Sequence, residues 1–590
     1  MIDLKKAFRL PPTPWNRNFV LLGLFAVALT IKLMIFFFAT DPIIFSKYPY
    51  FAEQLARGLD IGERLVDLSP VYLYINLIFY QLYGADWEVL AVLQILIGSL
   101  SCLLVYAIGE KLFDRRVGLT ATVIMILYGN LTLIELTLEP ETFVIFFSLL
   151  TVLALIRAKD GLSSRYNFRQ WFLAGVLLGL SGITKPNALL ILPGALIWIG
   201  WNHFSIQKKM FAMLFLLLGV ALVVSPVTIR NYVHFNDFIM VTADGGKVFY
   251  HGNGPGATGL ERADLPHQGF AEEGQDEPDY AHVLFRNTAR ALSGAPLKPS
   301  ECSRFWFERT LRHMATDPAR SGVMGLKKVF FFWGDYEVHD IDSTYKNYLT
   351  IQSWPLIPFG IIAALGILGM GLSIGRFRET FLLYWMVLAY LFSVLVFFAA
   401  SRYRLPAIPF LCIFAACAVN GLLLHVRDRN WKKCGAYLGI TLAVYAGLNL
   451  PFRDQTRRFD QWQRATRIHY SLGGTLLFQK GLYPEAIREF QLTLDLQPGF
   501  VPAYNYLGKS YSILNQYEKA EEAFRRVVQL APEIDTGYMN LGLLYQLKGD
   551  RPQAMHYIGK ALSLNPGNKK ARRHLEAMQT PEAKKGGHVD

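Results

Sequence analysis

Four acidic side chains stand where long apolar runs of the chain end. Asp41 closes the first run in FFFATDPIIF, and Glu135, Glu139 and Glu141 occur together in IELTLEPETF. A carboxylate beside hydrocarbon must face water, a partner or a ligand, because burying it alone is costly. Each acid could simply be a solvated residue. If Asp41 and Glu139 share a cavity, one could act as general base for an acceptor hydroxyl and the other could orient the acceptor or a divalent metal ion.

Basic side chains occur in three comparable places. Arg402 and Arg404 lie in SRYRLP between two apolar runs, Lys185 lies in TKPN, and Arg230 lies with Asn231 in TIRNY. In an extended segment the two arginines would point the same way, and paired guanidinium groups beside hydrocarbon suit the phosphate of a lipid carrier. The alternatives are a snorkelling lysine and a structural ion pair between an arginine and one of the acids.

The signatures of soluble nucleotide-dependent enzymes are missing from the sequence. It contains no Walker loop, HExxH, GxSxG or paired CxxC motif, and the Gly-rich HGNGPGATG (251–259) alone is weak evidence for phosphate binding. A soluble enzyme that uses nucleotide sugars is therefore not indicated.

The elements that carry these residues are apolar runs long enough to cross a membrane. Of the 590 residues, 52% are hydrophobic and 18% are charged, which is too apolar for one soluble domain. Runs of about 15–25 apolar residues can span hydrocarbon as helices. We therefore expect an all-α polytopic membrane domain over residues 1–450 with about eleven spans: 19–39, 88–110, 118–134, 142–157, 171–184, 188–202, 211–228, 356–375, 380–400, 405–425 and 434–450.

Basic connectors predict the orientation of this domain. They all fall on one side if the segment 70–84 lies at the interface or re-enters instead of crossing, and the positive-inside rule makes that side cytoplasmic. The N-terminus is then cytoplasmic, and the regions outside are 40–87, 135–141, 229–355 and everything after 450. Tyr48 opens an amphipathic segment (48–58) suited to the membrane surface above Asp41. The net charge of +13 is explained by the basic loops and does not indicate a nucleic-acid partner.

The C-terminal region contains a repeat. After a linker at 451–466, Gly474, Gly508 and Gly542 recur at an interval of 34 residues, and alanines and prolines keep the same register. This period is typical of tetratricopeptide repeats, so residues 467–568 are predicted to form three repeats with a groove for a protein or peptide partner. Residues 569–590 would form a capping helix (569–579) and a tail.

Seven stretches, taken in order, resemble glycosyltransferase family 39. They are Asp41 with its loop, LSPVYLYINLIFYQLYG, FDRRVGLTATVIMILYG, LEPETF, TKPNALLILPG, SPVTIRNY and SRYRLPAIPF. The relatives include protein O-mannosyltransferases and lipid A aminoarabinose transferases. The resemblance is to the bacterial branch, with GT-C architecture and a tetratricopeptide tail.

The resemblance implies transfer of a sugar from a polyprenyl-phosphate donor to an acceptor hydroxyl at the outer face of a bacterial inner membrane. By this resemblance Asp41 and Glu139 are the catalytic acids and, if a divalent metal is used, its candidate ligands. Lys185, Arg402 and Arg404 match the positions that hold the donor phosphate. Further candidates for substrate contact are Tyr48, Glu135, Glu141, Arg230, Asn231 and Tyr403.

Two other functions fit the same sequence. One is a non-catalytic scaffold for envelope assembly, in which the repeats recruit partners and the membrane part anchors them. The other is a lipid-linked glycan ligase or polymerase that also binds a lipid phosphate through external arginines. Convergence of Asp41, Glu139 and Arg402 on one place would favour the transferase.

Overall fold

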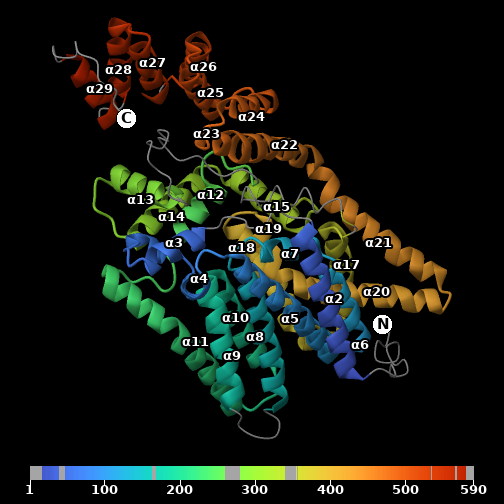
Figure 1. The fold of residues 1–590 in the computed structure, drawn as a ribbon. Coiled ribbons are helices and arrows are strands. Elements are labelled where there is room, and N and C mark those ends of the chain that lie inside the picture. The colour runs from blue at the N-terminus through green and yellow to red at the C-terminus, as the bar shows by residue number, and fades with distance from the viewer. Residues whose placement is uncertain are drawn as a thin grey trace. The chain divides into compact units, whose positions relative to one another are not determined.

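The structure is a computed structural model that describes residues 16–38, 47–161, 168–259, 280–338, 354, 356–532, 535–564 and 568–579. Every regular element in these ranges is a helix, as Figure 1 shows, so the predicted all-α class is confirmed. The described residues form two compact units, one ending at Arg453 and one beginning at Asp454. Asp41 lies outside the described residues.

The first unit is a bundle of long helices with a layer of shorter helices at one end. The helices of the bundle are α2 (Arg17–Phe38), α5 (Glu88–Leu112), α6 (Arg115–Ile126), α7 (Gly129–Glu135), α8 (Glu141–Gly161), α9 (Phe168–Thr184), α10 (Ile191–Trp201), α11 (Ile206–Phe235), α17 (Phe359–Ser373), α18 (Phe377–Val396), α20 (Ile408–Arg427) and α21 (Trp431–Asn449). The remaining helices and the 3-10 turns of this unit are α3 (Lys47–Ala56), α4 (Pro70–Tyr83), α12 (Gly245–Asn253), α13 (Tyr280–Ser293), α14 (Pro299–Thr316), α15 (Pro318–Trp333), α19 (Ser401–Arg404), Gly62–Val66, Pro186–Leu190, Ile374–Arg376, Leu405–Ala407 and Leu450–Phe452.

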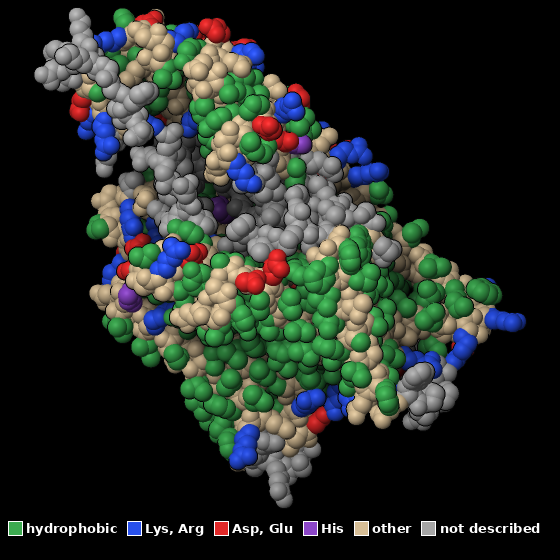
Figure 2. Space-filling model, viewed as in Figure 1, with side chains coloured by type: hydrophobic (Ala, Val, Ile, Leu, Met, Phe, Trp, Pro, Cys, Tyr) green, Lys and Arg blue, Asp and Glu red, His purple; other side chains and the backbone are tan. Residues whose placement is uncertain are grey.

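Seven helical stretches of the described residues are long and apolar enough to cross a membrane, or eight if the bent pair α6–α7 is one span. They are α2, α5, α8, α11 and the stretches Phe359–Val396, Ser401–Arg427 and Trp431–Trp462. The surface of this unit fits the assignment, because hydrophobic side chains cover a broad area over its long helices (Figure 2). The predicted class of polytopic membrane protein is confirmed.

The predicted number of eleven spans is not confirmed. The segments 356–375 and 380–400 were expected as two spans, but the turn Ile374–Arg376 joins α17 and α18 into one stretch of 38 residues. The helices α9 and α10 have 17 and 11 residues, which is short for hydrocarbon about 30 Å thick. The predicted span 118–134 is broken into α6 and α7, which meet at a bend of 61°.

The layer of short helices comes mostly from the predicted outer regions. Figure 1 shows α3, α12, α13 and α14 together at one end of the long helices. α12 packs on α14 so closely that a Cβ added to Gly246 would overlap the carbonyl of Ser303. Trp306 of α14 fills the centre of the layer, with its ring 4.6 Å from Tyr250 and 5.1 Å from Phe285. The amphipathic segment predicted over 48–58 is helical as α3 and packs on α4.

The second unit is a stack of helix pairs. Its elements are α22 (Arg453–Gln463), a π-helical turn (Arg464–Thr475), α23 (Leu476–Gln479), α24 (Tyr483–Leu496), α25 (Val501–Ile513), α26 (Tyr517–Leu530), α27 (Asp535–Leu547), α28 (Arg551–Leu564) and α29 (Lys569–Gln579). The repeated glycines lie where paired helices cross. A Cβ at Gly508 would overlap the ring of Phe524, and one at Gly542 would overlap Ile558, so only glycine permits this spacing.

Candidate functional site

The predicted acid Glu139 lies on a short connection between α7 and α8. The preceding residue, Leu138, is fully buried and has a positive φ of 45°, a conformation that costs a non-glycine residue roughly 1–2 kcal/mol. Pro140 follows Glu139 and restricts it to extended backbone. Such strain persists only where the surroundings hold it.

Three basic side chains act on the Glu139 carboxylate. Arg402 of α19 forms an ion pair with it, with Nη1 3.7 Å from Oε2, and Lys47 and Lys185 add their positive charge. The pKa of Glu139 is raised to about 7, because burial and the neighbouring Glu141 carboxylate raise it more than the three cations lower it. This carboxyl therefore titrates near neutral pH, which suits proton transfer.

The predicted residues Glu141, Lys185 and Tyr403 belong to the same cluster. The Lys185 ammonium donates to the fully buried carboxylate of Glu141 and lies 4.6 Å from the centre of the Tyr403 ring. The guanidinium of Arg402 lies 5.2 Å from the same ring. Two cations thus lie close to one aromatic ring, beside the carboxylates of Glu139 and Glu141. We call Glu139, Glu141, Lys185, Arg402 and Tyr403 the charged cluster.

Tyr48 lies next to the charged cluster, as its place in the sequence suggested. Its hydroxyl accepts a hydrogen bond from the backbone N–H of Ser69 at 3.2 Å, and its ring meets Tyr72 edge-on at 4.8 Å. Burial raises the pKa of both phenols above their ordinary value, and the charge of Glu139 raises both further. Both tyrosines are therefore neutral at physiological pH.

Glu135 is held by a different partner. The ammonium of Lys32 in α2 donates to its carboxylate, and both side chains are buried among the long helices. Gln94 of α5 donates to the backbone carbonyl of Glu135, and Gly98 leaves the space that the carboxylate fills, since a Cβ there would overlap it. Glu135 therefore ties three membrane helices together instead of lining the charged cluster.

Arg404 does not share the surroundings of Arg402. The segment Ser401–Arg404 is helical, not extended as predicted, so the two guanidinium groups do not lie side by side. Arg404 is 3% exposed, and its guanidinium contacts Glu337 at 2.9 Å and lies 3.6 Å from the centre of the Phe359 ring. It also donates to three backbone carbonyls, while the Tyr128 hydroxyl donates to Glu337 at 2.6 Å.

Arg230 and Asn231 support the end of α11. The Asn231 amide donates to the carbonyls of Ile239 and Val241 at 2.9 and 3.2 Å, and Arg230 donates to Asn231 and to the Tyr74 hydroxyl. None of these partners belongs to the charged cluster, so the structure does not bring this predicted pair to it.

Lys47 is the residue of this site that the sequence reasoning did not identify. It begins α3, next to Tyr48, and its charge reaches Glu139 from an element remote in sequence. The available signal was a single basic residue at the start of an amphipathic segment that would lie above the acids. Among the described residues, no group of three or more His, Cys, Asp or Glu is placed to hold a metal ion.

The fold and the charged cluster define a polytopic α-helical membrane protein with a buried group of acidic and basic side chains, and a separate unit of stacked helix pairs. Residues 67–229 match the family described as dolichyl-phosphate-mannose-protein mannosyltransferase. Residues 501–534 and 536–568 each match the tetratricopeptide repeat. These matches confirm the predicted resemblance to family 39 over that part of the membrane unit, and they cover two of the three predicted repeats.

Two curated relatives each match about a fifth of the chain. The chloroplast protein PYG7 of Arabidopsis thaliana, named for its tetratricopeptide repeat domain, is 31% identical over 131 residues, which are 22% of this chain and 42% of that protein. An uncharacterised protein of Cyanophora paradoxa, ycf37, is 26% identical over 121 residues, which are 20% of this chain and 70% of that protein. This chain thus spans less than half of the length of PYG7.

A solved structure with a partly similar course of the chain is the oligosaccharyltransferase of Archaeoglobus fulgidus, crystallised with a tethered acceptor peptide. The identity is 12%, the TM-score is 0.43, and the match covers 78% of this chain and 58% of that one. A likeness of this size says nothing about substrate or activity.

Proposed function

We propose that this protein is a membrane glycosyltransferase that takes a sugar from a polyprenyl-phosphate donor and transfers it to an acceptor hydroxyl. The observation that carries the proposal is the charged cluster, which brings Glu139, Lys185 and Arg402 together from three parts of the chain. Two of these three residues lie inside the segment that matches the mannosyltransferase family. The reaction would take place on the extracytoplasmic side of a bacterial inner membrane, with the repeats on that side too.

The donor phosphate is the group that the cations suit. The guanidinium of Arg402 can donate two parallel hydrogen bonds to phosphate oxygens, and Lys185 and Lys47 add point charges. Negative charge grows on the bridging oxygen as the bond from the anomeric carbon to the phosphate breaks, and preorganised cations stabilise that charge. In this proposal Arg404 serves a supporting role, because its buried contacts with Glu337 occupy it.

The acids are assigned to the acceptor. Asp41 takes the proton from the acceptor hydroxyl, whose oxygen attacks the anomeric carbon in a single displacement. Glu139 orients the acceptor, and its negative charge is stabilised by the same cations that hold the phosphate. If a divalent metal takes part, Asp41 and Glu139 are the residues that would hold it. The match of residues 67–229 to the mannosyltransferase family supports the assignment of Glu139, and the resemblance of the first loop supports that of Asp41.

Transfer assays on the full chain in membrane vesicles test the proposal. A radiolabelled polyprenyl-phosphate sugar is supplied, and lipid, protein and glycan fractions are counted. We expect Asp41→Asn to abolish transfer while the protein still binds polyprenyl phosphate. Full activity in Asp41→Asn would remove Asp41 from the mechanism, and unchanged lipid-phosphate binding in Arg402→Gln would remove Arg402 from the donor site.

We also propose that the tetratricopeptide repeats bind a partner. A tetratricopeptide groove suits a protein or peptide, which would either be the acceptor or bring the acceptor to the membrane. Removal of residues after 466 should leave donor binding unchanged and reduce transfer to the natural acceptor. A scaffold without catalytic function would instead show no transfer in the intact chain.

A further inference from the structure

The helix α15 contacts both ends of the segment that carries Arg402, which comprises residues 397–404. In the middle of α15, the ammonium of Lys328 donates to the carbonyl of Phe397 at 2.7 Å. At the end of α15, the carbonyls of Phe331 and Phe332 accept from Arg404 Nη1 at 3.1 and 3.0 Å. One helix therefore holds the first and the last residue of this segment.

Lys328 is fully buried and all three of its donors are used. They reach Asn253 Oδ1 at 2.7 Å and the carbonyls of Leu395 and Phe397 at 3.1 and 2.7 Å. The last carbonyls of a helix have no partner within it, and a cation there also interacts favourably with the helix dipole. Lys328 thus caps the C-terminal end of α18 from a neighbouring helix.

Asn253 completes this cap. Its amide donates to the carbonyl of Val396 at 2.8 Å, so three successive carbonyls at the end of α18 are bound by two side chains. Its neighbour Gly252 lies so close to Phe397 that a Cβ would overlap the Phe397 carbonyl oxygen. The Gly-rich stretch at 251–259, which alone suggested a phosphate loop only weakly, brings α12 against α18 instead.

Arg402 therefore sits between two fixed points. Before it, Phe397 is held by Lys328, and after it, Arg404 is held by Glu337 and by the end of α15. The backbone N–H of Ser401 donates to the carbonyl of Val338 at 2.8 Å, which fixes the start of α19. The segment that carries Arg402 is thus held before, at the start of and after α19.

We propose that Lys328 is a positioning residue that sets the place of Arg402 by holding the start of segment 397–404 on α15. The inference rests on the proposed function, in which Arg402 binds the donor phosphate. Without the ammonium, the carbonyls of Leu395 and Phe397 lose their partner, and the segment can move away from the position that aligns Arg402.

Binding of a polyprenyl monophosphate without sugar to the full chain in detergent tests this inference. Lys328→Met should weaken binding about tenfold, the order expected when a supporting contact lets a binding side chain shift. The matched control is Lys327→Met, which removes the same charge one position away on α15 and should change binding less than about twofold. Gel filtration and the midpoint of thermal unfolding report whether each variant is folded.

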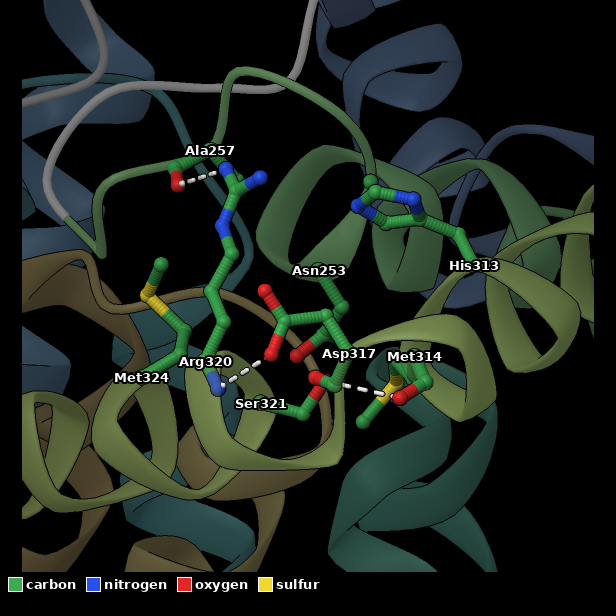
Figure 3. A pocket seen from close by; sticks show the side chains of 9 residues that line it. Asn253, Ala257, His313, Met314, Asp317, Arg320, Ser321 and Met324 are labelled. Atoms are coloured by element: carbon green, nitrogen blue, oxygen red, sulfur yellow. Dashed lines mark hydrogen bonds between the residues drawn. The ribbon is translucent and has the colours of Figure 1, made fainter.

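The double variant K328M/R402Q separates positioning from general damage. If Lys328 acts through Arg402, the double variant binds as weakly as Arg402→Gln alone, whereas independent effects would add and overturn the inference. If Lys328→Met does not fold, Asn253→Ala decides. Asn253 borders the pocket shown in Figure 3, next to Asp317 and Arg320, so the shorter side chain is accommodated there.

The outcomes also distinguish this inference from the proposed function. If Arg402→Gln leaves binding unchanged, the phosphate role of Arg402 fails. If Arg402→Gln weakens binding but folded Lys328→Met or Asn253→Ala does not, the positioning role fails and the proposed function stands.

Discussion

At the scale of the residue, two arginines separated by one position have opposite surroundings. Arg402 is partly exposed and pairs loosely with Glu139, whereas Arg404 is buried against Glu337 and the Phe359 ring. The sequence motif SRYR gives both the same chemical character. The difference arises because α19 is helical, which turns side chains at i and i+2 to different sides.

This difference predicts that substitution of Arg402 affects donor binding, whereas substitution of Arg404 affects stability. Arg402→Gln should keep the fold and weaken donor binding about tenfold or more, since hydrogen bonds to charged groups contribute roughly 1.5–3 kcal/mol. Arg404→Gln should destabilise the protein by about 3–5 kcal/mol, because it leaves the Glu337 carboxylate buried without its counter-charge. Thermal unfolding and lipid-phosphate binding, measured on both variants, check the pair. Equal loss of stability in the two variants would contradict the assignment.

The raised pKa of Glu139 predicts the pH dependence of transfer. Its carboxyl is half ionised near pH 7, so the rate should rise with pH through that value if the carboxylate is the active form. Arg402, Lys47 and Lys185 favour the ionised form and Glu141 opposes it. The residual rate of Glu139→Gln should lack this rise. A profile of the variant identical to that of the wild type would exclude Glu139 as the titrating group.

The same carboxyl should make the protein less stable as the pH rises, whereas the transfer rate should increase. Its pKa is higher in the folded protein than in the unfolded chain, where it is about 4.3. Between about pH 4.3 and about pH 7, the folded state binds more protons than the unfolded chain. The contribution of the Glu139 carboxyl to the free energy of unfolding is therefore fully present below this range and is lost as the pH rises through about 7. Thermal unfolding of the wild type and of Glu139→Gln across this range isolates the effect of Glu139.

At the scale of the element, the ion pair between Lys32 and Glu135 links α2 to α7, the helix just before Glu139. Either Lys32→Met or Glu135→Leu alone should destabilise the protein by about 3–5 kcal/mol, because each leaves one charge buried among membrane helices. The double variant should recover most of this loss, since an apolar pair needs no counter-charge. Unfolding in graded detergent mixtures measures the stability of the two single variants and of the double variant. Additive losses would show that the pair does not interact.

Sequence patterns predicted elements better than their connections. The run 19–39 forms α2 and the cap at 569–579 coincides with α29, because apolar content and repeat spacing are local properties. Whether two apolar runs join or bend depends on packing, so α17 and α18 continue into each other while α6 and α7 bend by 61°. For the site, the pattern identified Glu139 and Lys185, yet the partners of Arg404 and the role of Lys328 required contacts between remote segments.

At the scale of the whole molecule, the repeats form a compact unit separate from the membrane helices. Each repeat contacts its neighbours through the tight crossings at Gly508 and Gly542, so stability in such stacks depends on these interfaces. Gly542→Ala should lower the free energy of unfolding of the repeat unit by about 1–3 kcal/mol, because the added methyl overlaps Ile558.

Gly559→Ala is the matched control for that change. It lies in α28 with open space around it, so alanine should stabilise the helix by roughly 0.5–1 kcal/mol. Hydrogen exchange measured on the full chain gives the exchange rates of peptides from both units in one experiment. The first substitution should raise exchange in the repeats and leave peptides around Glu139 unchanged. Faster exchange in both units would show that they unfold together.

The pair between Lys32 and Glu135 also has a consequence for biosynthesis. The two residues are 103 positions apart, so at 5–20 residues per second the ribosome makes Lys32 about 5–20 s before its counter-ion. During that interval α2 carries an ammonium that costs about 2.5–3.5 kcal/mol at the centre of a bilayer. We therefore expect α2 to stay beside the insertion channel, away from lipid, until α7 arrives to neutralise this charge.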